Sequence, residues 1–408
     1  MKKIVIIGGG HAAAQAVTSL RQKKFSGSVT LVSDENMVPY QRPPLSKAYL
    51  SGELAAERLP ILRETAYDAA GVALRLNTRA EAIDRKTKTV RLSGGETLDY
   101  DKLILATGGR ARKLSCPGAE LTGIHYVRTI ADTDALRPEF NTAGRILIIG
   151  GGYIGLEIAS VARKTGKEVT VLEAESRILA RVVAPEVSSF YQSLHESEGV
   201  TIHTEQMVTA IEGGSHVEGV LTADGNHYAA DLVIVGIGLI ANSDLAADVR
   251  LETAPMGITV NHFAQTSDPD IYAIGDVSWH RNAFYGRELR LESVQNAVDQ
   301  AKTAIGHMLG EDAAYDSLPW FWSDQYGLKL QIAGLSQGYD SVVMRGNPDE
   351  RSVAFFYLKG GNLIAADCVG RIAEFMNAKK LILAKVPVTA AQLTEERPFK
   401  EIAAELLA

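Results

Sequence analysis

A short apolar strand followed by a glycine-rich turn occurs twice in this chain of 408 residues. The first copy reads IVIIGGGHAA at residues 4–13, and the second reads ILIIGGGYIG at residues 146–155. Each turn leads into a helical stretch and then a β-rich strand, at residues 29–32 and 169–172, and acidic residues follow each strand. This order is typical of a βαβ unit, so the sequence predicts an α/β fold with two such units and parallel strands.

Both turns have the spacing that binds the pyrophosphate of a dinucleotide. The first glycine makes the tight turn, the second lets the main chain approach phosphate, and a small third residue lets helix and strand pack closely. The helix that follows directs free N–H groups and its positive dipole end at the phosphates. The residues in these positions are Gly8, Gly10 and Ala13 in the first copy, and Gly150, Gly152 and Gly155 in the second.

An acid about 20 residues beyond such a turn binds the adenosine ribose. Glu173 lies at the end of its strand, where a carboxylate accepts from a ribose 2′-hydroxyl and repels a 2′-phosphate. The second site is therefore predicted to prefer NADH to NADPH, with Arg177 as the residue that would favour NADPH if it turned toward a 2′-phosphate. In the first copy Ser33 stands in the place of Glu173, which leaves Asp34 and Glu35 as alternative ribose ligands.

Composition excludes several other classes of protein. The chain has 42 Lys and Arg against 49 Asp and Glu, and a net charge of −7 argues against general nucleic-acid binding. No apolar run approaches the roughly 18 residues of a membrane-spanning helix. The two cysteines, Cys116 and Cys368, form no metal-binding or disulfide pattern, so no metal and a reducing, cytoplasmic location are expected.

The pattern along the chain predicts three domains. Apolar strands at residues 103–106 and 232–235 each end in a glycine turn, whereas the last part has strand-like stretches at 352–358 and 363–369 and a helical stretch at 395–407. The predicted division is an FAD-binding domain at 1–114 and 242–319, an NAD-binding domain at 115–241 and a C-terminal α+β domain at 320–408. Two dinucleotide sites in one chain imply two cofactors, FAD and NADH, as in a flavin reductase.

Longer motifs carry a family resemblance that covers nearly the whole chain. They are PPLSKAYL at residues 43–50, LATGG at 105–109, GGGYIGLE at 150–157, IYAIGD at 271–276, ESV at 292–294 and PWFWSDQY at 319–326. On these motifs the chain resembles the FAD-dependent ferredoxin reductases of bacterial monooxygenase systems, of the putidaredoxin reductase type. The resemblance implies a glutathione-reductase-like fold, with two Rossmann-like domains and a C-terminal α+β domain. One departure is Ala241, where the family often has proline.

The resemblance also implies roles for particular residues around the flavin. An acid at the position of Asp276 binds the ribitol chain of FAD. The main chain of Val294 lies at the N1–C2=O edge of the flavin, where Ser293 would cap a helix over residues 294–308. The positive end of that helix would stabilise the negative charge of reduced flavin. An arginine at the position of Arg128 reaches the FAD pyrophosphate.

The same resemblance pairs Lys47 with Glu157 near flavin N5, beside the nicotinamide site, and these two are the predicted catalytic residues. Trp322 or Trp320 is expected near the dimethylbenzene side of the flavin. The remaining cofactor-binding positions carried over from the family are Ala12, Pro43, Ala80, Ala106, Thr107, Gly108, Tyr153, Ile154, Gly238, Gly275 and Glu292.

The resemblance implies that NADH passes a hydride to flavin N5 and that electrons leave singly to a 2Fe-2S ferredoxin. That partner would bind transiently and serve a cytochrome-type monooxygenase or a ring-hydroxylating dioxygenase, with the reductase itself expected to be a monomer. A rubredoxin is an alternative acceptor. An NADH oxidase or disulfide reductase needs a reactive cysteine, and the segment at residues 40–47 has none. A flavoprotein with a purely interacting role is the third alternative.

Overall fold

The computed structural model describes all 408 residues and divides into two compact units, each assembled from distant segments of the chain. The first unit contains Met1–Arg42, Leu54–Arg110 and Leu239–Ser317. The second contains Pro43–Glu53, Ala111–Gly238 and Leu318–Ala408. The two glycine-rich turns therefore belong to different units.

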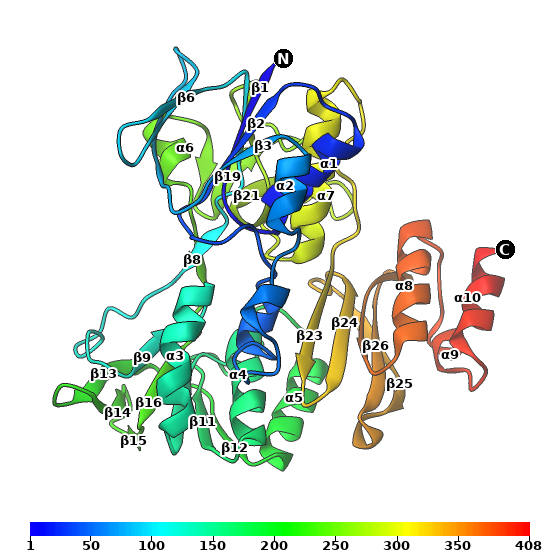
Figure 1. Cartoon of the computed structure of the whole chain (residues 1–408). Coiled ribbons are helices and arrows are strands. Elements are labelled where there is room, and N and C mark those ends of the chain that lie inside the picture. Colours follow the sequence, from blue (N-terminus) through cyan, green and yellow to red (C-terminus); the bar gives the residue numbers. More distant parts are fainter. The chain divides into compact units, whose positions relative to one another are not determined.

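A five-stranded sheet forms the centre of the first unit, with all of its neighbouring strands parallel. Its strand order is β20 (Ile271–Ala273), β7 (Lys102–Leu105), β1 (Lys3–Ile7), β2 (Ser28–Val32) and β3 (Val72–Arg75). Helices α1 (His11–Gln22) and α7 (Val294–Met308) pack side by side in this unit (Figure 1). Helices α2 (Glu64–Ala69) and α6 (Asp244–Asp248) complete its set.

Alternating side chains of β1 reach two separate hydrophobic cores, because successive residues of a strand point to opposite faces of the sheet. Ile4 and Ile6 join the core that includes α1 and α7. Val5 and Ile7 join a second core with residues of two smaller sheets. These sheets contain β4 (Ala80–Asp84), β5 (Thr89–Leu92) and β6 (Thr97–Asp99), and β18 (Thr253–Ala254), β19 (Gly257–Val260), β21 (Ser278–Asn282) and β22 (Arg287–Leu289). The sheet is thus buried on both faces, which explains the continuous apolar run in β1.

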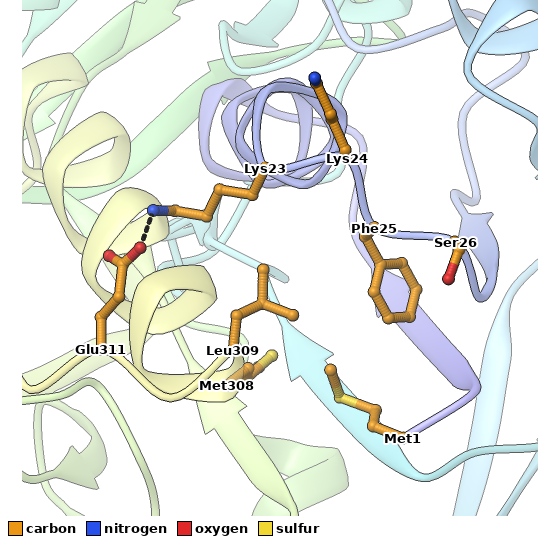
Figure 2. Close-up of a pocket in the computed structure, with 8 residues that line it drawn as sticks. All are labelled: Met1, Lys23, Lys24, Phe25, Ser26, Met308, Leu309 and Glu311. Atoms are coloured by element: carbon orange, nitrogen blue, oxygen red, sulfur yellow. Dashed lines mark hydrogen bonds and ion pairs between the residues drawn. The ribbon is translucent and has the colours of Figure 1, made fainter.

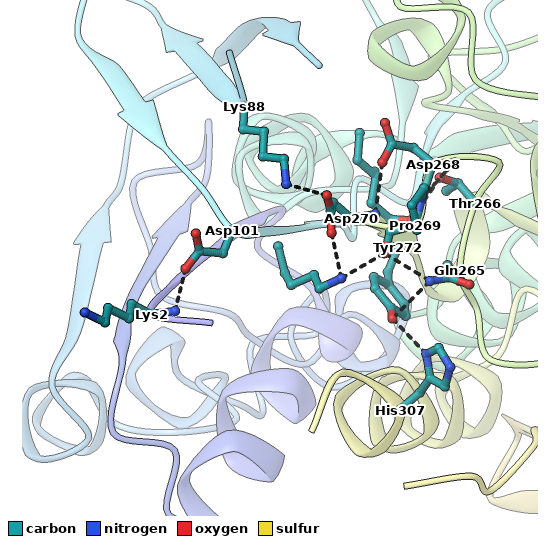
Figure 3. Close-up of polar contacts among 12 residues, drawn as sticks. Lys2, Lys88, Asp101, Gln265, Thr266, Asp268, Pro269, Asp270, Tyr272 and His307 are labelled. Carbon is teal, nitrogen blue, oxygen red and sulfur yellow. Dashed lines mark hydrogen bonds and ion pairs between the residues drawn. The ribbon is translucent and has the colours of Figure 1, made fainter. Parts of the chain in front are cut away.

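Polar contacts hold the edge strand β20 in place, both just before its first residue and within the strand (Figure 3). Asp270, just before the strand, accepts from Lys88 Nζ at 2.5 Å and from Lys102 Nζ at 2.7 Å. The hydroxyl of Tyr272 lies 2.8 Å from Nδ1 of His307 on α7. These contacts hold the strand that leads into the predicted Gly275–Asp276 turn.

The second unit repeats the parallel architecture. Its sheet has the order β12 (Val200–His203), β11 (Glu168–Leu172), β10 (Arg145–Ile149), β16 (Leu232–Val235) and β9 (Ile124–Tyr126), and every pairing is parallel. Its helices are α3 (Ile130–Thr142), α4 (Tyr153–Lys164) and α5 (Pro185–Ser197). A three-stranded antiparallel sheet follows, with β13 (Val208–Gly213), β14 (Val217–Thr222) and β15 (His227–Ala229). Strands β8 (Gly109–Ala111) and β17 (Leu239–Ala241) pair where the chain changes unit.

The C-terminal part of the second unit is an antiparallel five-stranded sheet with the order β23 (Trp320–Gln325), β24 (Leu328–Gly334), β27 (Asn362–Val369), β26 (Ser352–Lys359) and β25 (Ser341–Asn347). Leu330 and Phe355 of this sheet share one core with Leu156 of α4 and Tyr191 of α5. Helix α8 (Ile372–Ala384) packs on β27 and β24, with α9 (Ala390–Thr394) and α10 (Phe399–Leu407) beyond it. No helix of the chain is long and apolar enough to cross a membrane.

Both predicted βαβ units and the α/β fold class are confirmed. The predicted helix at 294–308 is confirmed at α7, and the strands predicted near 352–358 and 363–369 are β26 and β27. The predicted helix at 395–407 begins only at Phe399, because Pro398 occupies its N-cap and the preceding residues belong to a separate short turn. The division into three domains stays a prediction.

Candidate functional site

The first glycine-rich turn joins β1 to α1 and has the shape of a phosphate-binding loop. Gly8 has φ +133°, and a Cβ there would overlap the carbonyl oxygen of Ala106. Gly10 is the N-cap of α1 and is not closed by any side-chain capping bond. Ala13 is fully buried where the helix meets the strand. A main-chain cradle at an uncapped helix N-terminus fits the pyrophosphate of a dinucleotide.

The second turn, between β10 and α4, reproduces this geometry. Gly150 has φ +106°, and a Cβ there would lie 2.5 Å from the carbonyl oxygen of Gly236. Gly152 is the N-cap of α4, again without a side-chain cap. A Cβ on Gly155 would overlap the carbonyl oxygen of Gly150, so the third glycine permits close packing of helix and strand. Both units thus offer the same kind of dinucleotide cradle.

The two acids proposed for the first ribose differ in their surroundings. Both carboxylate oxygens of Glu35 are bonded, one to Arg42 Nη2 and one to Tyr40 Oη, each at 2.5 Å. Asp34 is exposed and has no bonding partner in the chain. Ser33 lies against Gly9 as Glu173 lies against Gly151 in the second turn, which confirms the alignment of the two copies.

Arg42 is a residue of this region that the sequence did not single out. Its side chain is 19% exposed, and Nε lies 4.0 Å from the position of a Cβ on Gly10. Arg42 is also within electrostatic range of Asp276. The sequence signal for it was weak, because an arginine in a proline-containing loop is usually solvated.

The predicted Gly275–Asp276 turn lies beside α1. Gly275 has φ +77°, and a Cβ there would lie 3.3 Å from the Cβ of Ala12. The turn is held by Gln300 of α7, whose Oε1 accepts from Gly275 N and from Ser278 Oγ, both at 2.8 Å. Ser293 caps α7 by accepting from Asn296 N at 3.1 Å, as predicted. Gln300 was missed because a glutamine within a helix carries no motif.

Other predicted flavin positions of the first unit lie at strand ends and in the loops between elements. Ala106 is buried at the end of β7, and Ala80 is buried at the start of β4. Thr107 Oγ1 donates to the carbonyl oxygen of Asn242 at 2.8 Å, and Asn242 N donates to Gly108 O at 2.9 Å. Glu292 pairs with Arg290.

Glu173 lies at the mouth of the second turn. Its Oε2 accepts from Gly151 N at 2.7 Å, and its Oε1 accepts from Glu175 N at 2.9 Å. Arg177 donates instead to the carbonyl oxygen of Ala180 at 2.9 Å, so its guanidinium is held by main chain. Arg181, a residue with no motif in the sequence, lies within 4 Å of the position of a Cβ on Gly238.

The first two residues of α4 present an apolar surface. Tyr153 packs against Phe321 with ring centroids 4.7 Å apart and ring planes tilted by 35°, and burial raises the pKa of its hydroxyl. Ile154 is 37% exposed, so its side chain is accessible to a ligand at this helix start.

The predicted Lys47–Glu157 pair is present within the second unit. Lys47 follows a single 3₁₀ turn, Pro43–Ser46, and its Nζ lies 2.6 Å from Glu157 Oε2. It also donates to the carbonyl oxygen of Pro43 at 3.1 Å. Glu157 is only 5% exposed and accepts further bonds from Ser46 Oγ at 2.6 Å and Ser323 Oγ at 2.7 Å. A buried carboxylate of this kind is held by a cation and two hydroxyls.

Arg128 and Trp322 also belong to the second unit. Arg128 directly precedes Thr129, the N-cap of α3, and its main-chain N donates to Asp132 at 3.0 Å. Trp322 lies on β23 with its ring centroid 5.5 Å from that of Trp320. Strand alternation places both tryptophans on the face of β23 opposite to Ser323.

A shallow pocket of 660 Å³ lies in the first unit at the C-terminal ends of α1 and α7 (Figure 2). Its lining includes Lys23, Phe25 and Leu309, and Lys23 pairs with Glu311 across it. The glycine turn is at the opposite end of α1, about 18 Å away at 1.5 Å per residue. The pocket is therefore separate from the dinucleotide cradle.

Comparison with known proteins places these features in a family. Residues 2–301 match the pyridine nucleotide-disulphide oxidoreductase family, and residues 320–403 match a reductase C-terminal family. The chain is 43% identical to the 5,5'-dehydrodivanillate O-demethylase ferredoxin reductase subunit of Sphingobium sp., over 98% of both chains. It is 40% identical to a rubredoxin-NAD(+) reductase of Pseudomonas putida, over 90% of this chain and 95% of that protein. The crystal structure of a covalent putidaredoxin reductase–putidaredoxin complex matches with a TM-score of 0.96 and 41% identity, covering 100% of this chain and 99% of that one.

Proposed function

The chain belongs to the pyridine nucleotide-disulphide oxidoreductase family and is an oxidoreductase, and we propose that it carries electrons from NADH through FAD to a 2Fe-2S ferredoxin. The observation that carries the proposal is the presence of two glycine turns with the same geometry, one in each unit. Bound FAD supplies redox chemistry that side chains lack, because it accepts two electrons as a hydride and gives them up singly. The rest is binding and positioning by this chain.

The first unit is proposed to hold FAD. The Gly8–Gly10 turn and the N-terminus of α1 bind its pyrophosphate. Asp34 and Glu35 are both kept as alternative ribose ligands. Asp34 is exposed. Glu35 is bonded through both oxygens, but so is Glu173 in the second turn, and this does not exclude it. Asp276 binds the ribitol chain, on a turn that Gln300 holds in place.

The second unit is proposed to hold NADH. The Gly150–Gly152 turn and the N-terminus of α4 bind its pyrophosphate, and Glu173 accepts from the ribose 2′-hydroxyl. Lys47 and Glu157 form the proposed charged pair that orients the reacting rings. Arg177 Nη2 is bonded to the carbonyl oxygen of Ala180, which supports NADH over NADPH.

A ferredoxin is the favoured acceptor because of the subunit to which the chain is 43% identical. A rubredoxin is the second candidate acceptor, because the chain is 40% identical to the rubredoxin-NAD(+) reductase of P. putida. The encounter is proposed to be transient, as redox encounters with small interfaces usually are. A monomeric state and a cytoplasmic location remain parts of the proposal, the latter because Cys116 and Cys368 are both free thiols.

The test is to purify the protein, record its absorbance spectrum and add one equivalent of NADH without oxygen. The expected result is a flavin spectrum that NADH bleaches rapidly, followed by reoxidation when a 2Fe-2S ferredoxin is added. Faster reoxidation by a rubredoxin than by a panel of ferredoxins would replace the proposed acceptor. A colourless protein, or a flavin that NADH leaves oxidised, would contradict the assignment of one of the two cradles.

A further inference from the structure

We propose that Ser323 of strand β23 is a positioning residue for Glu157, and that a buried hydrogen-bond chain through Gln325 and His195 keeps it in place. The inference deepens the proposed function, since it rests on the role of the Lys47–Glu157 pair in flavin reduction. It gives the C-terminal sheet a part in the hydride step that neither dinucleotide motif contains.

The carboxylate of Glu157 is bonded through both of its oxygens. Oε2 accepts from Lys47 Nζ and Ser46 Oγ, each at 2.6 Å. Oε1 accepts from Ser323 Oγ at 2.7 Å. A carboxylate that is removed from water needs donors on each oxygen to remain ionised at low cost. Ser323 supplies the donor on the side away from Lys47.

The hydrogen bonds beyond Ser323 have only one consistent direction. A serine hydroxyl has one proton, and Ser323 donates it to Glu157, so its oxygen accepts from Gln325 Nε2 at 3.1 Å. The other end of that amide, Oε1, can only accept, so His195 Nε2 at 2.7 Å must carry a proton. His195 Nδ1 then accepts from the hydroxyl of Tyr326 at 3.2 Å. Every donor in the chain points toward Glu157.

Burial protects this arrangement from solvent. Ser323 and His195 are fully buried and Gln325 is 1% exposed, so water has no access to replace a lost partner. Burial also lowers the pKa of His195 to about 4, which keeps the imidazole neutral, so that Nδ1 is free to accept from Tyr326. A neutral buried chain with a single direction polarises each successive donor toward the carboxylate.

Loss of the Ser323 hydroxyl is expected to change the orientation of the Glu157 carboxylate. Without the Ser323 hydroxyl, Oε1 has no donor while Oε2 keeps two. The carboxylate is then expected to rotate so that both oxygens share Ser46 and Lys47, which displaces the ammonium group. Ser323 therefore acts on the reaction through Glu157 and not by touching a cofactor.

The test uses single-turnover flavin reduction by NADH in the holoenzyme, without oxygen. Ser323→Ala is expected to slow reduction about tenfold, the effect of losing one hydrogen bond to a charged group. In a Glu157→Ala background the same substitution is expected to change the rate less than twofold. Gln325→Met, which keeps the shape of the side chain without its donors, is expected to slow reduction by about threefold, again only when Glu157 is present. Ser19→Ala, a buried serine of α1 in the other unit, is the matched control and should leave the rate unchanged.

An equal slowing by Ser323→Ala with and without Glu157 would overturn the proposal. A second measurement does not depend on turnover: ¹⁵N chemical shifts of histidine-labelled holoenzyme report the tautomer of His195. The expected signal is the neutral Nε2–H form, unchanged down to about pH 5. A proton on Nδ1 would reverse the direction of the chain and refute the inference. If instead NADH fails to reduce the wild-type flavin, the proposed function is wrong. The tautomer of His195 then still tests the direction of the hydrogen-bond chain.

Discussion

Lys47 and Glu157 are 110 positions apart in the sequence, and their side chains meet with Nζ 2.6 Å from Oε2. The lysine comes from the short segment Pro43–Glu53 that leaves the first unit and joins the second. The glutamate comes from the first turns of α4, directly after the second glycine turn. An ion pair thus ties the proposed nicotinamide-binding helix to a loop that the sequence had assigned to the flavin-binding domain.

Replacement of Lys47 by alanine is expected to weaken this site in a measurable way. Glu157 would keep two hydroxyl donors but lose its counter-charge in a buried position, which is costly. We expect single-turnover flavin reduction by NADH to slow about tenfold or more, or FAD to be partly lost during purification. Stopped-flow absorbance and the flavin-to-protein absorbance ratio measure the two effects. Wild-type values of both would contradict the assigned role.

Gln300 should control retention of FAD. Its Oε1 accepts from Gly275 N and Ser278 Oγ, and the Ser278 hydroxyl also lies 2.9 Å from the carbonyl oxygen of Gly275. Gln300→Ala therefore leaves the buried Gly275 N without an acceptor in the turn that carries Asp276. The expected result is an FAD dissociation constant raised at least tenfold, corresponding to about 1.4 kcal/mol or more. Reconstitution of apoprotein followed by flavin fluorescence measures it. Lys302→Ala, an exposed neighbour on the same helix, is the control, and equal affinities of the two variants would rule out the role of Gln300.

Glu173 should determine the choice between NADH and NADPH. Removing its carboxylate in Glu173→Ala eliminates the acceptor for the ribose 2′-hydroxyl and the repulsion of a 2′-phosphate. We expect kcat/KM for NADH to fall about tenfold, which is the effect of losing one hydrogen bond to a charged group. We expect kcat/KM for NADPH to stay the same or rise. Steady-state kinetics with each cofactor give both values. If the wild-type protein prefers NADPH, Glu173 does not determine the choice between the two cofactors.

Asp367 gives the stability of the chain a specific pH dependence. Burial, with a contribution from Glu186, raises the pKa of this carboxyl to about 7, although Tyr357 donates to it at 2.9 Å. Between about pH 4 and pH 7 the folded chain holds a proton that the unfolded chain releases, so this residue's contribution to stability falls as pH rises through that window. Three pKa units correspond to about 4 kcal/mol of unfolding free energy as an upper bound.

Asp367→Asn removes that titration while keeping an acceptor for Tyr357. The melting temperature of the variant relative to wild type is therefore expected to be several degrees higher at pH 8 than at pH 5. His195 and His280, whose pKa values burial lowers to about 4, destabilise the fold as pH falls below 6.5, but they act equally in both proteins. Differential scanning fluorimetry across pH 5–8 measures the difference. A difference that does not depend on pH would mean that Asp367 does not titrate in this range.

The features that depend on local spacing could be predicted well from the sequence. The glycine turns, the strands and helices beside them and the Ser293 cap of α7 are all encoded within about 30 consecutive residues. Sterics require glycine where a Cβ would strike a carbonyl oxygen, as at Gly8 and Gly150. The spacing of glycines in the sequence therefore predicts the geometry of the turn. The pairing of Lys47 with Glu157 came from family resemblance and not from spacing.

Residues without a motif became visible only in the folded chain. Arg42, Gln300 and His195 are ordinary residues in the sequence, and nothing within their own segments distinguishes them from solvated or helix-lining side chains. Ser323 lies within the motif at residues 319–326, but that motif does not reveal its contact with Glu157. The difference between Asp34 and Glu35 likewise needed coordinates, because it depends on whether Arg42 and Tyr40 reach one acid and not the other.

The sequence by itself determined the two parallel βαβ units and where a dinucleotide can approach main chain, because backbone sterics and hydrophobic periodicity act over short distances. Only the tertiary structure decided which polar groups are buried together, because burial depends on segments that lie far apart in the chain. Glu157 and Ser323 are separated by 166 positions, and the bond between them exists because the C-terminal sheet shares a core with α4. The cost of an unpaired buried carboxylate then makes that distant contact matter.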